Sequence, residues 1–526
     1  MTKLSQTSID GQRYYKIADS DQMRPFFMSI VSDANHWMFI SSNGGLTAGR
    51  KDSEYALFPY YTDDKITESV ETTGSKSIFQ VQKDGKTVVW EPFSVRNEGR
   101  FNVSRNLYKS VYGNQVIFEE FNQDLGITFR YQWSSSATYG FVRTSTLTNH
   151  NDETVTIALI DGIQNLLPYG VGSDLQRQSS NLADAYKRSE LHAQSGLGIF
   201  ALSAIIVDKA EPSEALKANT VWSVGLDAPT HLVSSLQLEP FRRGVAVQQE
   251  TDVKGEKGAY FLHKELVLAP KADQRWIIVA DVNQNRIEVE ELIQELGSPD
   301  ELTQRIKQNI ARGTEQLIAL TAASDGLQLT ADERGDTRHF SNVLFNIMRG
   351  GIFDNNYQIE KWDFEKYLAK GNKRVSERHQ KFTAALPDLF SLFDLRSQLE
   401  GIDDPALQRL AIEYLPLKFS RRHGDPSRPW NKFSINTHNE EDGSKILDYQ
   451  GNWRDIFQNW EALAHGYPEF MEGMIALAVP IRDTHGRLFA TLSFHAPTQR
   501  FDIERAKAFL PQLDESAVEL SRLSFA

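Results

Sequence analysis

A polar and aromatic cluster stands out in the stretch QGNWRDIFQNWEALA, residues 450–464. It brings together Trp453, Arg454, Asp455 and Gln458 in a run that is compatible with a helix. A guanidinium, a carboxylate and an amide beside indole rings are typical of a polar pocket with aromatic walls. Two bland alternatives stay open, since Arg454 and Asp455 would also suit an internal ion pair, and the indole rings would also suit packing between helices.

A second group of candidate residues lies upstream, in the stretch DPSRPWNKF. Trp430 and Asn431 stand there in a long loop rich in aromatic and charged residues, which is unusual for a plain connection. We expect this loop to fold over the same pocket, although a proline-flanked stretch would also serve as a rigid turn. The twelve histidines show no HExxH pattern, so we expect no metal and no cofactor.

The composition sets limits on the class of protein. The chain has 526 residues, 40% of them hydrophobic, which predicts a globular protein of two to four domains at about 150 residues each. A formal net charge of −13 argues against a nucleic-acid partner, because phosphate binding needs a basic face. There is no cysteine and no apolar run long enough for a bilayer, so we expect a cytoplasmic protein without a membrane partner.

Strand-like alternation dominates the chain as far as about residue 285. The stretch SIFQVQKDGKTVVWEPF predicts a hairpin that turns at Asp84 and Gly85. A second hairpin is expected in TLTNHNDETVTIALIDGI, with its turn at 149–153. Many such segments predict a large antiparallel β-sandwich, interrupted by a helical excursion over 179–193.

The period changes to that of helices near Arg286. In GSPDELTQRIKQNIARGTEQLIAL we expect a helix with Ser298 as N-cap, Pro299 at its first position and a capping box to Glu301. Its apolar residues fall on one stripe from Leu302 to Leu320. The pattern stays helical over 336–473, where long polar loops between helices are what an α/α toroid presents on its ligand face.

The last segment changes again. IALAVPIRDTHGRLFATLSFHAP predicts a β-hairpin that turns over 483–486, and an amphipathic helix is expected after it, over 503–520. The fold class is therefore β then α: a large antiparallel β-sandwich, a helical connector, an incomplete α/α toroid, and a C-terminal hairpin plus helix. We expect domain limits at 1–285, 286–325, 326–473 and 474–526.

Residues 1 to about 473 resemble the inverting glycoside phosphorylases of the cellobiose and chitobiose phosphorylase type. The resemblance rests on SSNGGLTAGRKDSEYALFPYYTDDKI, on GNWRDIFQNWEAL, and on the order of sandwich, connector and toroid. In that family the element RDxxQD binds the sugar at the cleaved position. It implies sugar contacts from Arg454, Asp455 and Gln458, whereas Asn459 stands where the family usually has a second aspartate.

Residues from about 474 to 526 resemble the end of the effector-binding domain of IclR-type transcription regulators. The stretch MIALAVPIRDTHGRLFATLSFHAPTQRF carries this resemblance. The phosphorylase resemblance implies that the general acid and most phosphate ligands belong to toroid helices beyond the Arg-Asp element. That region is replaced here by the IclR-like tail, so we expect sugar contacts without catalysis, and no catalytic residue is assigned.

The sequence thus predicts a carbohydrate-active protein derived from a glycoside phosphorylase. Its expected partners are a sugar or oligosaccharide and inorganic phosphate, and the resemblance implies a homodimer. Two alternatives stay open: a regulator fragment that senses an effector through the tail, and a non-functional product of gene fusion.

Overall fold

The chain divides into two compact units. The first comprises Met1–Ala319 and His423–Ile435, and the second comprises Leu320–Arg422 and Asn436–Ala526. The structure, a computed structural model, describes residues 4–204, 206, 216–422, 424–428, 432–439, 442–471, 473–474, 511 and 515, and the backbone of 479–482 and 488–492. None of the helices in this part of the chain has the length and apolar character that a membrane span requires.

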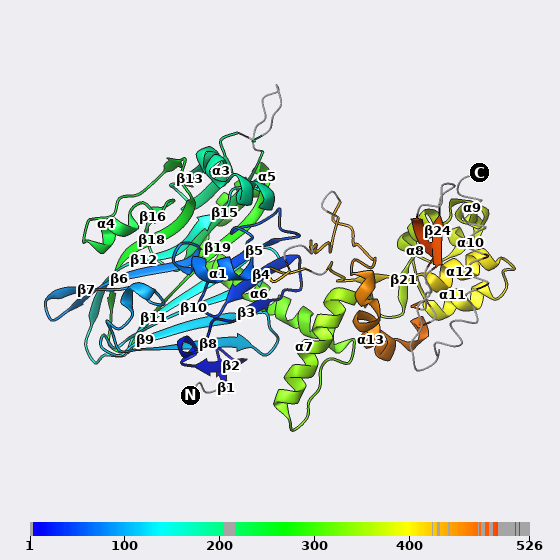
Figure 1. The fold of residues 1–526 in the computed structure, drawn as a ribbon, viewed down its shortest axis with the longest axis horizontal. Helices are drawn as coiled ribbons and strands as arrows, with labels where there is room; N and C mark the ends of the chain where they lie inside the picture. The colour runs from blue at the N-terminus through cyan, green and yellow to red at the C-terminus, as the bar shows by residue number, and fades with distance from the viewer. Residues whose placement is uncertain are drawn as a thin grey trace. The chain divides into compact units, whose positions relative to one another are not determined.

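The first unit is built on two large antiparallel sheets and one small one (Figure 1). The 11-stranded sheet contains, in spatial order, β1 (Leu4–Ile9), β2 (Gln12–Ala18), β8 (Val103–Ser110), β9 (Val116–Asn122), β10 (Ile127–Ser136), β11 (Gly140–Asn149), β19 (Asp273–Asn285), β15 (Lys217–Val224), β14 (Leu197–Leu202), β13 (Lys187–His192) and β17 (Asp252–Lys254). The 5-stranded sheet contains β16 (Thr230–Leu232), β18 (Gly258–Leu268), β12 (Val155–Leu166), β6 (Gly74–Lys83) and β7 (Lys86–Trp90). The 3-stranded sheet contains β3 (Phe27–Ile30), β4 (His36–Ser41) and β5 (Leu46–Arg50).

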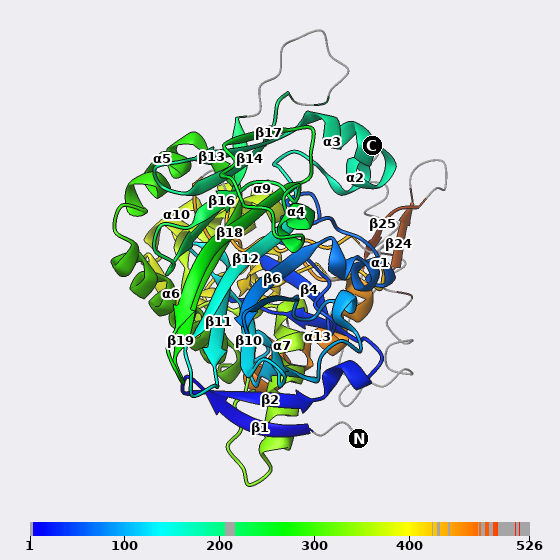
Figure 2. The ribbon, with the colours of Figure 1, turned by 90° about the vertical axis from the view of Figure 1, so that its left-hand side faces the viewer.

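One apolar core lies between the two large sheets, which confirms the predicted sandwich. Phe79 and Trp90 of the 5-stranded sheet and Phe129 and Trp276 of the 11-stranded sheet belong to this core, and all four are buried. Figure 2 shows β6, β12 and β18 in front of β10 and β11. The period-2 alternation of the sequence places these large side chains on the inner faces.

The hairpin predicted at Asp84 and Gly85 is confirmed. Strands β6 and β7 pair antiparallel with Phe79 opposite Trp90. Both turn residues have positive φ, 50° and 70°, as a two-residue hairpin turn requires.

The second predicted hairpin is wrong, although both of its strands exist. β11 pairs with β10 and β19, whereas β12 pairs with β6 and β18 in the other sheet. The stretch between them is therefore an arch from one sheet to the other. The Asn149 side chain fixes this arch by donating to the carbonyl oxygens of Glu153, Leu268 and Ala269.

The helical excursion predicted over 179–193 is half right. Helix α3 (Ser180–Tyr186) ends at Tyr186, and strand β13 follows at once. Residues of β13 alternate between buried and half-buried, and they pair with β14 along their whole length. Tertiary pairing thus overrides the helical preference of this stretch.

A fully buried ion pair connects the two large sheets. Arg143 of β11 and Asp161 of β12 both have side chains 0% exposed, with their nitrogen and oxygen atoms 2.7 Å apart. The Asp161 carboxylate also accepts from Ser77, Ser145 and the indole of Trp276. Every hydrogen-bonding position of this carboxylate therefore has a partner from one sheet or the other.

The predicted helical connector packs on the outer face of the 11-stranded sheet. Helix α5 (Arg286–Glu295) begins with a capping box between Asn285 and Glu288, and α6 (Pro299–Ala322) begins at the predicted proline. Leu302 and Ile306 of α6 are buried against the sheet, which confirms the apolar stripe there. The other helices in the described part of this unit are α1 (Asp63–Glu68), α2 (Ser173–Gln178) and α4 (Leu238–Arg242).

The second unit is mainly helical. Its helices are α7 (Glu333–Gly350), α8 (Lys361–Gly371), α9 (Lys373–Arg378), α10 (Gln380–Ala385), α11 (Leu392–Leu399), α12 (Pro405–Glu413) and α13 (Ile456–Gly466). Three two-stranded pairs accompany them: β20 (Ile352–Phe353) with β23 (Leu417–Lys418), β21 (Gln358–Glu360) with β22 (Leu389–Ser391), and β24 (Val479–Arg482) with β25 (Leu488–Leu492). The helical character expected over 336–473 is present, and the arrangement of a toroid stays a prediction.

The C-terminal segment is described only in part. β24 and β25 pair antiparallel with Val479 opposite Leu492, on either side of the expected turn. The helix predicted over 503–520 lies outside the described residues, except for positions 511 and 515.

Candidate functional site

The Arg-Asp-x-x-Gln element opens helix α13. Arg454 and Asp455 belong to a 3₁₀ turn, Trp453–Asp455, that leads into the helix. The Arg454 side chain is 73% exposed, and its Nε lies 3.2 Å from Oδ1 of Asp455, so the two form a surface ion pair. Gln458 is also exposed. These three predicted residues therefore lie at the start of one helix, with Arg454 and Gln458 exposed and Asp455 half-buried.

The opposite face of α13 is used for packing. Asn459 is buried next to the last turn of α7, where a Cβ added to Gly350 would lie 2.5 Å from the Asn459 carbonyl oxygen. The Trp460 indole donates to the Gly350 carbonyl oxygen at 3.0 Å and meets the Tyr449 ring edge-to-face. Asn459, the departure from the phosphorylase pattern, is thus on the packed side of the helix, and Trp460 follows the packing alternative.

Three further predicted residues lie wholly or partly outside the described part of the chain. The backbone of Trp453 lies in the 3₁₀ turn, while its side chain is outside the described part, as are Trp430 and Asn431 entirely. The loop on both sides of the last two belongs to the first unit. Their role in sugar binding stays a prediction.

Phe433 anchors that loop on the sandwich. Its buried ring packs against the rings of Trp37, Phe39 and Tyr60, with centroids 5.3, 5.9 and 5.5 Å away. The amide of Ile435 donates to the Lys51 carbonyl oxygen at 2.6 Å. Sequence reasoning missed this anchor, because its signal is an aromatic residue almost 400 positions away from its partners.

Several residues of the motif SSNGGLTAGRKDSEY have structural roles in the first unit. A Cβ added to Gly45 would lie 2.1 Å from the Ile66 carbonyl oxygen, so only glycine fits there. The Arg50 guanidinium binds Asp281 of β19 through two bonds, of 2.7 and 2.9 Å. Part of the phosphorylase resemblance thus lies in residues that hold the sandwich together.

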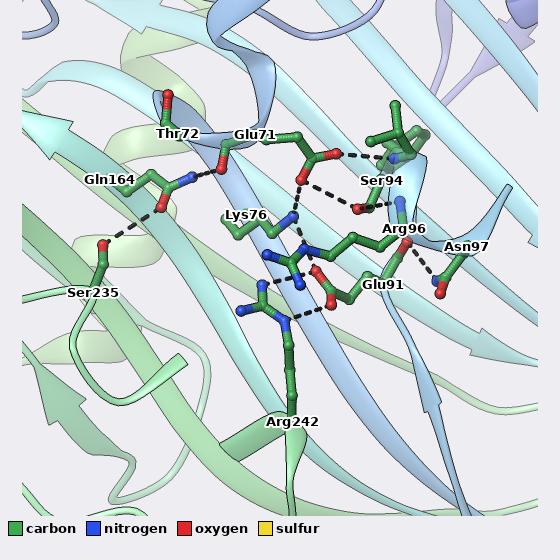
Figure 3. Close-up of polar contacts among 12 residues, drawn as sticks. Glu71, Thr72, Lys76, Glu91, Ser94, Arg96, Asn97, Gln164, Ser235 and Arg242 are labelled. Carbon is green, nitrogen blue, oxygen red and sulfur yellow. Dashed lines mark hydrogen bonds and ion pairs between the residues drawn. The ribbon is translucent and has the colours of Figure 1, made fainter. Parts of the chain in front are cut away.

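Charged side chains at the edge of the 5-stranded sheet form a closed network (Figure 3). Lys76 lies between Glu71 and Glu91, at 2.5 and 3.0 Å, and Arg242 of α4 binds Glu91 through two bonds. Glu71 also accepts from Ser94. Each carboxylate is already engaged by cations, so the network positions the 91–97 loop and α4 and offers nothing to a substrate.

This network predicts acid sensitivity. Burial would raise the pKa of Glu91, but the bonds from Arg242 and Lys76 outweigh it and hold the pKa below its ordinary value of 4.5. The pKa of Glu71 is lowered in the same way by Lys76. A lowered folded-state pKa contributes stability that is present above pH 4.5 and is lost as the pH falls through the folded value.

We expect the unfolding free energy to fall between about pH 5 and 3, and to fall less steeply in Glu91→Gln. Denaturant unfolding at several pH values measures this. Parallel pH profiles for the two proteins would contradict the assignment.

Buried carboxyl groups in the second unit have partners as well. Asp354 is bound by Lys418 and Lys445, both at 2.7 Å, which keep its pKa below the usual range against the effect of burial. Burial raises the pKa of Asp363, which accepts from the Tyr414 hydroxyl at 2.7 Å. Asp363 is buried, so this acid has no open path to a ligand. Nowhere in the described residues do three or more histidine or acidic side chains gather closely enough to hold a metal ion.

Two family models match parts of the second unit. Residues 353–416 match the glycoside hydrolase family 149 insertion domain 1, and residues 460–522 match the bacterial transcriptional regulator IclR C-terminal domain. The second match begins inside α13, earlier than the limit near residue 474 expected from sequence. No curated protein matches the chain.

Similar solved structures give only a coarse likeness. A bacterial glucoamylase complexed with acarbose has a TM-score of 0.37 and 9% identity, over 69% of this chain and 51% of that one. A putative kojibiose phosphorylase from the human microbiome has a TM-score of 0.34 and 9% identity, over 70% and 47%. This chain therefore spans about half the length of either structure. At these TM-scores the likeness assigns no activity.

The two matched segments share one core. Phe470, from the IclR-like match, stacks on Phe353 and lies parallel to Tyr357, both at the start of the family 149 match. The hydroxyl of Tyr467 donates to Asn356 at 2.7 Å, and Tyr357 donates to Glu469. The chain thus combines a segment like a glycoside hydrolase insertion domain with one like an IclR C-terminal domain, and their described parts pack together.

Proposed function

We propose that this protein binds carbohydrate, is derived from a glycoside phosphorylase and lacks its general acid. The observation that carries the proposal is the group at the start of α13, where Arg454 and Gln458 are exposed and Asp455 is half-buried. The match of residues 353–416 to a glycoside hydrolase insertion domain supports it.

The chemistry of the cluster suits sugar hydroxyl groups. The guanidinium of Arg454 donates only, the carboxylate of Asp455 accepts only, and the amide of Gln458 does both. Each hydroxyl group of a pyranose ring can both donate and accept a hydrogen bond, so each of the three side chains can bind one. Trp453 is part of this proposal, with its indole ring stacking on a C–H face of the sugar, and Trp430 and Asn431 are proposed as further sugar contacts.

The proposed loss of catalysis is based on the absence of a suitable carboxylic acid among the described residues of the second unit. Inverting cleavage needs a carboxylic acid of raised pKa beside the leaving oxygen. Among the carboxyl groups in the described part of the second unit, Asp363 has a raised pKa, and it is buried and bonded to Tyr414. Inorganic phosphate would then bind weakly or not at all. A cytoplasmic location is part of the proposal, supported by a sequence without cysteine.

Calorimetry with cellobiose, a β-linked disaccharide, tests the binding. We expect saturable binding that weakens by about tenfold or more in Arg454→Ala and in Asp455→Ala, since each removes a charged hydrogen bond of roughly 1.5–3 kcal/mol. Arg409→Ala is the matched control, because Arg409 forms an exposed ion pair with Glu413 in the same unit. Equal effects of all three changes would refute the assigned site.

Turnover is a separate readout. Phosphate release or consumption with sugar 1-phosphate donors should not be detectable. Sustained turnover would show that a general acid is present and that the chain is an active phosphorylase.

A second candidate function is effector sensing by the IclR-like segment. The match over 460–522 favours it, and so does the packing of Phe470 and Tyr467 into the second unit. Under this proposal a small effector or a second copy binds that segment. Salt-dependent binding to DNA, with no sugar binding, would favour it over the carbohydrate proposal.

A further inference from the structure

The second unit carries a concentration of positive charge on three consecutive helices, α8, α9 and α10. Residues 361–381 contain seven lysine and arginine residues against three acidic residues, in a chain whose formal net charge is −13. One of these acids, Asp363, is buried and bonded to Tyr414, so it does not face solvent. We call the exposed cations of this segment the basic surface: Lys366, Lys370, Lys373, Arg374, Arg378 and Lys381.

Most cations of the basic surface have no acidic partner. Arg378 pairs with Asp404 at 2.7 Å, and the Lys373 amine lies 3.8 Å from the Glu377 carboxylate. The other four cations form no ion pair within the described part of the chain. Their charge is therefore available to an anion from outside the protein.

The placement of these cations does not stabilise the helices that carry them. Lys366 and Lys370 are four residues apart on α8, where like charges repel each other across one turn. Lys373 and Arg374 stand in the first turn of α9, which has no acidic residue, although the positive end of a helix dipole favours acids. Helix stability therefore does not account for this charge, whereas a bound anion would remove the repulsion.

An exposed tryptophan lies on the same side of α8. Trp362 is 40% exposed and precedes Lys366 by four residues, and Nζ of Lys366 lies 5.5 Å from the centre of its ring. The indole N–H donates to Glu360 at 2.6 Å, and Lys445 holds the other oxygen of that carboxylate, also at 2.6 Å. The indole is therefore fixed in place beside the amines of α8, with part of its ring open to solvent.

We propose that the basic surface and Trp362 bind an acidic oligosaccharide, whose sugar rings carry carboxylate or sulfate groups. The amines bind either anion, and the indole provides a face for stacking of one sugar ring. A nucleic acid fits less well, because a single strand stacks successive bases on several aromatic side chains. The other aromatic side chains of 361–381 are buried or half-buried. This site uses other helices than the Arg454 group and does not rest on it.

Calorimetry of the full-length chain with two probes tests this proposal. One probe is hexagalacturonate, which carries carboxylate alone, and the other is a heparin hexasaccharide, which carries sulfate as well. We expect saturable binding of at least one probe at about 50 mM NaCl, and an affinity lower by about tenfold or more at about 200 mM, because several amines release counterions. Binding of the heparin probe alone would identify sulfate as the preferred anion.

Matched variants separate the basic surface from the net charge of the chain. The triple change Lys366→Gln, Lys370→Gln and Arg374→Gln should weaken binding by about tenfold or more. Trp362→Ala should weaken binding without changing its salt dependence, since it removes stacking and no charge. The control triple change to glutamine removes the same charge from three exposed, paired cations of the first unit and should have no effect: Lys254, Lys271 and Arg275.

Three results would overturn the proposal. The first is that neither probe binds at low salt, and the second is an equal loss of affinity in the two triple variants. The third is tighter binding of a DNA hexanucleotide than of either sugar, which would assign the basic surface to nucleic acid. Cellobiose binding should be the same in the Lys366 triple variant as in the wild type, so a wild type that binds an acidic probe but no cellobiose would count against the Arg454 site alone.

Discussion

Replacing Asp161 with alanine is expected to destabilise the sandwich by about 3–5 kcal/mol. The change leaves the Arg143 guanidinium without a counter-charge at a site where both side chains are 0% exposed. It also removes the acceptor of the Trp276 indole and of the Ser77 and Ser145 hydroxyl groups. Guanidinium unfolding followed by tryptophan fluorescence measures the loss, because Trp276 itself reports on the site.

Two further variants test whether the loss of stability comes from the burial of the ion pair. Asp252→Ala removes an exposed partner of Arg188 and should cost less than about 1 kcal/mol. The double change Arg143→Met with Asp161→Leu removes both charges and should recover much of the stability lost by Asp161→Ala, even where the single variant does not fold. Equal losses at Asp161 and Asp252 would mean that burial of the pair contributes nothing.

Replacing Phe433 with alanine should release residues 432–435 from the sandwich. The ring lies among three other aromatic rings, so its removal leaves a cavity and costs about 3 kcal/mol of anchoring energy. Hydrogen exchange provides the measurement. The amide of Ile435, bonded to the Lys51 carbonyl oxygen, should lose its protection in the variant.

The same variant bears on sugar binding. If Trp430 and Asn431 belong to the site as proposed, cellobiose affinity should fall together with the protection of Ile435. Phe393→Ala, which removes an exposed ring of the second unit, should change neither quantity. Unchanged exchange at Ile435 in Phe433→Ala would show that the loop is held elsewhere.

The sequence predicted which residues of the candidate site are polar, but it did not predict which side chains of α13 face away from them. The types of Arg454, Asp455 and Gln458 indicated polar contacts, and the structure places all three at the start of α13, with Arg454 and Gln458 exposed and Asp455 half-buried. Which residues face away was not predictable, because Asn459 and Trp460 are as polar or aromatic as their neighbours. Their direction depends on Gly350, about 110 residues earlier, which makes room for α13.

Local patterns determined the local elements of this protein. Alternation gave the strands, Asp84 and Gly85 gave a tight turn, and Pro299 gave the start of α6, since each of these depends on residues within one or two turns. Tertiary structure alone decided which sheet each strand joins, where α3 gives way to β13, and which charges meet. β11 and β12 alternate alike but lie in different sheets, because pairing depends on distant partners whose burial energy exceeds any local preference.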